Sequence, residues 1–138
     1  MKNIEDKIIS NFESIKDDID GNFGNTWQSK KHFTSHVEKR IFLKHVASEK
    51  DYITKILECL STSVEYVFAQ HENSWDNICY NSDKSWAVIF NEHGKIMTSY
   101  KIEPKSKSFE STQSSIKAKI TKGVPNEKFR KYFKRLRS

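Results

Sequence analysis

The sequence predicts an α+β fold, with N-terminal helices packed on a four-stranded or slightly larger antiparallel meander sheet and a basic C-terminal helix. Apolar residues recur at helical spacing before residue 60 and alternate, as in strands, between residues 64 and 102. Short polar segments separate the strand-like runs, as in consecutive hairpins. The length of 138 residues and the 12% aromatic content predict one folded domain.

Three helices are expected in the N-terminal part of the chain. The first covers residues 4–19, where isoleucine and phenylalanine recur three or four positions apart. The second runs from about Ser35 to Ala47, because Ser35 and Glu38 have the spacing of a capping box. The third covers residues 51–60, which carry an apolar face at helical spacing.

Four strands and a last helix are expected after residue 60. The strand at 85–90 is apolar on both faces, so it should be central and covered by helices on at least one side. The Ser- and Lys-rich residues 105–122 are either a mobile loop or an edge strand. Pro125 then begins a helix over 126–136 with an apolar stripe. The four expected strands are 64–68, 77–80, 85–90 and 95–102.

Composition limits the class of protein. No apolar run is long enough to span a membrane, and the acid-rich first 20 residues do not resemble a secretory signal. Two cysteines, Cys59 and Cys79, cannot form a disulfide framework or a four-ligand zinc site, and we expect two buried free thiols. No metal or cofactor site is expected.

Charge is distributed unevenly along the chain. The net charge of +6 divides into about −3 for residues 1–100 and about +9 for residues 101–138. A basic third on a mildly acidic body predicts a polyanionic partner, with nucleic acid first; the alternative is a solvated tail that only aids solubility. The candidate phosphate-binding residues of the C-terminal helix are Lys128, Arg130, Lys131, Lys134 and Arg135.

The segment Lys30–Arg40 holds the densest cluster of candidate catalytic groups. If it is helical throughout, His32, His36 and Arg40 lie on one stripe, at i, i+4 and i+8. Two histidines beside several cations can transfer protons and stabilise phosphate charge. A zinc site is disfavoured, because Phe33 stands where an HExxH motif needs Glu. The alternative is a surface histidine pair on a basic helix.

A second cluster lies on the last strand of the expected meander. Alternation places Ile96, Thr98, Tyr100 and Ile102 on one face, and Met97, Ser99 and Lys101 on the other. A hydroxyl and an aromatic ring two residues apart can bind a phosphate oxygen and stack on a base. The alternative is that Thr and Tyr simply form strands well.

The hairpin Trp86–Ile102 resembles the terminal hairpin of the colicin D nuclease domain and of the superfamily that groups barnase, EndoU, colicin D and RelE-like ribonucleases. Its signature here is Thr98-x-Tyr100-Lys101, and the matching Lys-His motif is Lys31-His32. The resemblance covers about residues 28–104. Tyr100 stands where colicin D has Trp, which preserves the stacking area.

The resemblance implies a metal-independent endoribonuclease, often a tRNA-cleaving toxin of a bacteriocin or a contact-dependent growth inhibition system. It implies 2′-OH attack on the adjacent phosphate, giving a 2′,3′-cyclic phosphate and a 5′-OH. The implied catalytic residues are His32 or His36 as base, with Lys31, Thr98 and Tyr100. The implied phosphate contacts are Lys30, Arg40 and Lys101. The basic extension 105–138 lies outside the resemblance, so the cations of the C-terminal helix are candidates from the charge distribution alone.

The same resemblance implies the setting in which the domain would act. It would be delivered from a secreted or surface toxin into the cytosol of a target cell, and a cognate immunity protein would neutralise it. The free domain is expected to be a monomer, with a helix and linker over 1–26, a catalytic core over 28–104 and a basic extension over 105–138. Two other hypotheses are a non-catalytic RNA-binding module and a RelE-like, ribosome-dependent mRNA nuclease of a toxin–antitoxin pair.

Overall fold

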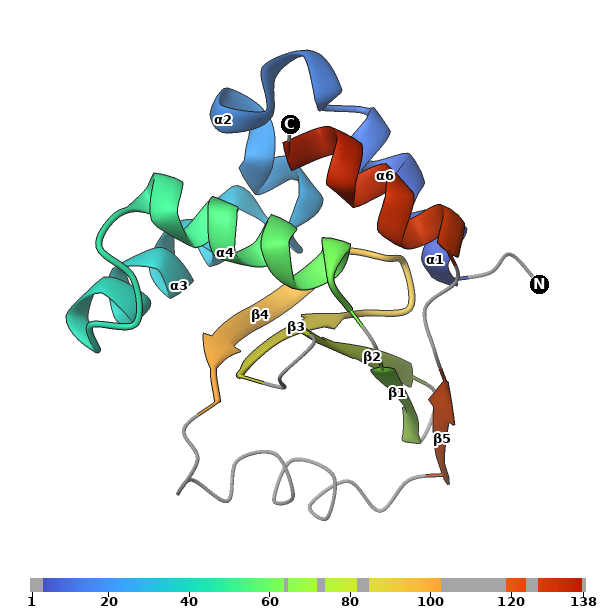
Figure 1. Ribbon diagram of the computed structural model, residues 1–138. Helices are drawn as coiled ribbons and strands as arrows, with labels where there is room; N and C mark the ends of the chain where they lie inside the picture. The colour runs from blue at the N-terminus through green and yellow to red at the C-terminus, as the bar shows by residue number, and fades with distance from the viewer. Residues whose placement is uncertain are drawn as a thin grey trace.

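The computed structural model describes residues 4–63, 65–71, 74–81, 85–102, 119–123 and 127–137. It has a helical layer over one face of an antiparallel sheet (Figure 1). The predicted α+β class is therefore confirmed.

The first expected helix is shorter than predicted. Helix α1 spans Ile4–Glu13 and buries Ile8 and Phe12 completely. The chain then continues in short turns, because the Asp18 carboxylate accepts a hydrogen bond from the Gly21 N–H and starts a new turn of helix. These turns are η1 (Lys16–Asp18), α2 (Ile19–Asn22) and η2 (Phe23–Thr26).

The second helix begins five residues before the predicted start. Helix α3 spans Lys30–Phe42, and its N-cap is Ser29, whose hydroxyl accepts a hydrogen bond from the His32 N–H. Ser35 is an exposed residue inside the helix, so its capping-box spacing was misleading. The third helix, α4, spans Glu49–Ser61, and Ser48 caps it in the same way.

Five strands are hydrogen-bonded in the order β4-β3-β2-β1-β5 within the described residues. Every residue of β3 is buried, and this strand lies between two others, so the prediction of a central strand at 85–90 is confirmed. Strand β5, which pairs with β1, falls at the end of the segment for which an edge strand was one alternative. The bounds are β1 Glu65–His71, β2 Ser74–Tyr80, β3 Trp86–Phe90, β4 Ile96–Lys101 and β5 Lys119–Gly123.

The main core lies between the helices and the sheet. Helix α4 packs on β2 and β3, and helix α6 (Glu127–Arg137) packs on α4 and α1 (Figure 1). The apolar side of α6 contributes Phe129 and Phe133, both fully buried against the rest of the core. Cys59 and Cys79 are buried and form no disulfide, as predicted. Residues 103–118, where the loop alternative and Pro104 fall, lie outside the described residues.

Candidate functional site at the edge of the sheet

Helix α3 covers the free edge of strand β4. An edge strand presents backbone carbonyls that no neighbouring strand pairs, and side chains of the helical layer bind two of them. The Met97 carbonyl accepts a hydrogen bond from Nε2 of His32. The Ser99 carbonyl accepts one from Nε of Arg40, at 2.9 Å, and one from the Tyr52 hydroxyl, at 2.6 Å. The strand edge is thereby bonded to two helices that are distant in sequence.

The three predicted stripe residues face this edge together. Because α3 is helical from Lys30, His32, His36 and Arg40 lie one above another along it. The two imidazole rings are 4.4 Å apart between centroids. Behind them lies the indole of Trp27, which is 1% exposed and whose ring lies within 6 Å of both. The predicted stripe is confirmed.

Thr98 joins Arg40 to His36. Its hydroxyl oxygen accepts a long hydrogen bond from a terminal nitrogen of Arg40, at 3.4 Å, and lies 3.1 Å from Nδ1 of His36. A guanidinium can only donate, so the hydroxyl proton is available to Nδ1 of His36. We assign the neutral His36 ring its proton on Nε2 on this basis.

His32 uses its other ring nitrogen, Nε2, to contact strand β4. A carbonyl can only accept, so the hydrogen bond to Met97 requires the proton of the neutral ring to be on Nε2. Nδ1 of His32 then keeps its lone pair. The pair therefore offers a proton acceptor on His32 and an N–H donor on His36, held by two separate contacts with β4.

The electrostatics keep His36 neutral at pH 7. Its pKa is lowered to about 4, first by burial and then by the neighbouring groups His32, Arg40 and Lys39. Lys39 was not among the predicted site residues, although it follows His36 by three positions and could have been found from helical spacing. Burial likewise raises the pKa of the Tyr52 hydroxyl to about 12, so it stays protonated and donates to Ser99.

Arg40 carries a buried positive charge. The residue is 7% exposed, and its contacts include the Ser99 carbonyl, the Thr98 hydroxyl and the Tyr100 ring, whose centroid is 5.5 Å from Cζ. No carboxylate pairs with it in the part of the chain that the structure describes. Buried charges in proteins are normally paired, so the guanidinium is suited to an anionic ligand.

The predicted alternation along β4 is correct at its end and wrong at its start. Thr98 and Tyr100 share a face, as predicted, and Ser99 is fully buried on the other. Ile96, however, lies in the main core, whereas Met97 packs with Tyr100 against the second apolar cluster. The pairing with β3 shifts register at this point, and such a bulge reverses the faces on either side of it.

The other predicted cations lie elsewhere. Lys30 and Lys31 are exposed in the first turn of α3, and within the described residues neither bonds to His32, His36 or Thr98. Lys101 is exposed at the end of β4 and lines a different pocket, together with Lys55. The structure thus brings His32, His36, Arg40, Thr98 and Tyr100 together and leaves the lysines around them.

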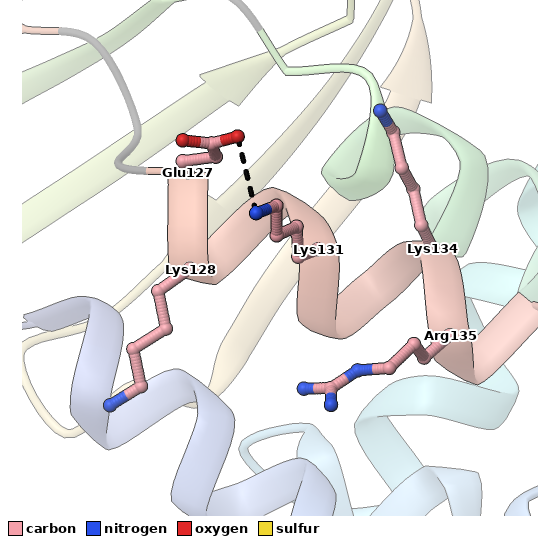
Figure 2. Close-up of a pocket in the computed structure, with 5 residues that line it drawn as sticks. All are labelled: Glu127, Lys128, Lys131, Lys134 and Arg135. Atoms are coloured by element: carbon pink, nitrogen blue, oxygen red, sulfur yellow. Dashed lines mark ion pairs between the residues drawn. The ribbon is translucent and has the colours of Figure 1, made fainter.

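Helix α6 carries a separate group of cations. A hollow of about 530 Å³ is lined by Lys128, Lys131, Lys134 and Arg135, with Glu127 (Figure 2). Figure 2 shows Lys131 turned back toward Glu127, with which it forms an exposed ion pair of 3.3 Å, while Lys128 and Lys134 extend in different directions. The predicted Arg130 is half-buried. Because α6 packs on α4 and α1, its cations do not join the histidine cluster.

The described residues hold neither a candidate metal site nor a candidate membrane span. They contain no group of three or more histidine, cysteine, aspartate or glutamate side chains able to hold a metal ion. They also contain no helix long and apolar enough to cross a membrane.

Comparison with known proteins gives a family. The chain is 33% identical over 66 residues to "Uncharacterized protein aq_aa01" of Aquifex aeolicus (strain VF5), a match over 46% of this chain and 49% of that protein. The chain thus spans about half the length of this relative. No solved structure matches the present chain. The family described as "Uncharacterised protein aq_aa01" matches residues 17–138, which is most of the sequence, and the chain therefore belongs to that family.

Proposed function

We propose that the protein is a metal-independent endoribonuclease that cleaves tRNA or another RNA at the edge of strand β4. One observation carries the proposal: the buried guanidinium of Arg40 has no carboxylate partner among the described residues, and it lies beside two imidazoles, one offering an acceptor and the other a donor. A phosphate would supply the missing anion. His32, His36, Thr98 and Tyr100 are each partly exposed, so a substrate can reach them.

The groups support attack by the ribose 2′-OH on the adjacent phosphate. Nδ1 of His32 takes the 2′-OH proton while the 2′-oxygen forms a bond to phosphorus. The P–O5′ bond then breaks, leaving a 2′,3′-cyclic phosphate, and the departing 5′-oxygen takes a proton from water. The His32 imidazolium returns its proton to solvent, which closes the proton balance.

The remaining groups stabilise the negative charge that develops on the phosphate. Nε2–H of His36 and the guanidinium of Arg40 are donors fixed in place before the substrate binds, through Thr98 and Ser99. Donors of this kind are worth most in a partly dehydrated site. The Tyr100 ring, held under Arg40, offers a face on which a base can stack.

The cations of α6 would bind RNA outside the reacting bond. Except for the half-buried Arg130, these candidate cations are exposed, and they lie on a helix whose apolar side is fixed in the core, so they form a rigid basic surface. Such contacts position nucleic acid and do not react.

Incubation of the purified protein with total RNA in EDTA tests this proposal. Discrete tRNA fragments ending in 2′,3′-cyclic phosphate are expected, because no step requires a metal ion. Binding without cleavage would instead favour a non-catalytic RNA-binding module. Cleavage that occurs only on ribosomes would favour a RelE-like mRNA nuclease.

A further inference from the structure

A polar pocket lies apart from the histidine cluster. It has a volume of about 330 Å³ and lies between helix α4, residues Asn81 and Ser85, and the end of β4. Lys55 and Lys101, both exposed, contribute their side chains to it, and neither has an ion-pair partner within the described residues. The other lining residues that matter here are His45, Glu58, Asn81 and Ser85.

This pocket is connected to the candidate active site through the Ser99 carbonyl. Arg40 of α3 and Tyr52 of α4 both donate to that oxygen. Lys101 follows Ser99 by two residues, an advance of roughly 7 Å along a strand. Lys55 follows Tyr52 by three residues, an advance of about 4.5 Å along a helix. Strand β4 and helix α4 therefore each lead from the Ser99 carbonyl to a lysine of the pocket.

The segment that follows helix α3 also leads to the pocket. After α3 ends, the backbone turns so that the His45 N–H donates to the Arg40 carbonyl, at 2.9 Å. Lys44 adopts a positive φ of 61° in this turn. His45 is thereby held directly beyond Arg40, where it lines the polar pocket.

A shallower hollow extends the pocket along the α3–α4 connection. It has a volume of about 580 Å³, shares His45 and Lys55 with the pocket and adds Lys44. Its one carboxylate, Asp51, accepts a hydrogen bond from the Ala47 N–H at the start of α4. We call the surface formed by Lys44, His45, Lys55 and Lys101 the lysine groove. It has three lysines against two carboxylates, Asp51 and Glu58.

We propose that the lysine groove binds the phosphates of the RNA strand next to the scissile phosphate. The inference rests on the proposed ribonuclease function, and it names the path by which the substrate leaves the reacting site. A strand held by Arg40 at its scissile phosphate then continues toward Lys101, which lies roughly 7 Å along β4 from Ser99, and toward Lys55 on the neighbouring helix. The groove binds backbone phosphate and carries no sequence preference of its own.

The test measures binding separately from cleavage. The probe is a uniformly 2′-O-methylated RNA oligonucleotide, which lacks the 2′-OH nucleophile and cannot be cut. Its affinity is measured over a range of salt concentrations for the wild type, Lys55→Gln and the double variant Lys55→Gln/Lys101→Gln. Lys50→Gln is the matched control, since it removes the same charge from an exposed site on the same helix outside the groove.

The double variant should make the negative slope of log affinity against log salt shallower by about 0.7 to 1.4, the effect of one or two lost phosphate contacts on a single strand. Lys50→Gln should leave the slope unchanged. In cleavage assays the double variant should raise KM several-fold with little change in kcat. A double variant with the wild-type slope would overturn the groove, even if the protein cleaves RNA. If the wild type never cleaves RNA but the double variant still shows the reduced slope, the groove is retained and the ribonuclease function is refuted.

Discussion

Two adjacent residues of β4, Thr98 and Ser99, should respond to alanine in opposite ways. Ser99 is fully buried; its hydroxyl accepts from Nε1–H of Trp86, at 2.7 Å, and donates to the Ala87 carbonyl, at 2.8 Å. Sequence alternation alone would place Ser99 away from the site and make its substitution nearly silent. The structure gives a different expectation, because the hydroxyl is the partner of a buried indole.

The magnitude follows from these contacts. A buried donor left without a partner costs about 1–3 kcal/mol, so Ser99→Ala should lower the free energy of unfolding by about that amount. Thr98→Ala removes a half-buried hydroxyl outside the core and should cost less, about 0.5–1.5 kcal/mol. It should, however, slow RNA cleavage roughly 100- to 1000-fold, because it disconnects Arg40 from His36.

Urea unfolding followed by circular dichroism measures the first effect, and single-turnover cleavage measures the second. Ser35→Ala is the matched control, since Ser35 is exposed on α3 and should change stability by no more than about 0.5 kcal/mol. The reasoning about the strand faces is refuted if Ser99→Ala is as stable as Ser35→Ala. The role of Thr98 is refuted if Thr98→Ala cleaves at the wild-type rate.

Three further results are expected. Ser29→Ala should destabilise the protein by about 1 kcal/mol, because Ser29 and not Ser35 caps α3. Equal stability of Ser29→Ala and Ser35→Ala would contradict this. Between pH 6.5 and 4, His36 binds a proton in the unfolded state but not in the folded state, so the free energy of unfolding should decrease as the pH is lowered through this window. The decrease should be less than about 1.4 kcal/mol per pH unit, because the ring is partly solvated. His36→Gln should remove that component, and NMR titration of the wild type should show a pKa near 4. Neutralising Lys128, Lys131 and Lys134 should flatten the salt dependence of RNA binding and leave cleavage at saturating RNA unchanged; an unchanged slope would make α6 a solvated surface.

The histidine stripe could be predicted from sequence because it depends on helical spacing alone. His32, His36 and Arg40 recur every four residues, and any helix that contains all three places them on one side. The start of that helix could not be predicted with the same certainty, because Ser29 and Ser35 are both plausible caps. In the structure Ser29 caps the helix, and Phe33, which a start at Ser35 would leave outside the helix, packs into the core.

Other features of the site depend on contacts between distant segments. The burial of Arg40 arises where α3 lies along the edge of β4, 59 residues later. Tyr52 meets the same carbonyl from another helix, and nothing in the spacing around it indicates this. The exchange of Ile96 and Met97 between faces follows from a bulge, which a period of two residues cannot reveal.

The rate of RNA cleavage by His32→Ala, measured in EDTA beside His93→Ala, tests the central claim most directly. His93 is exposed in the turn between β3 and β4 and is distant in sequence from the stripe, so its substitution controls for the loss of an imidazole. We expect His93→Ala to cleave tRNA at the wild-type rate and His32→Ala to lose cleavage while its circular dichroism stays unchanged. A folded His32→Ala that cleaves as fast as His93→Ala would contradict the assignment of His32 as the base.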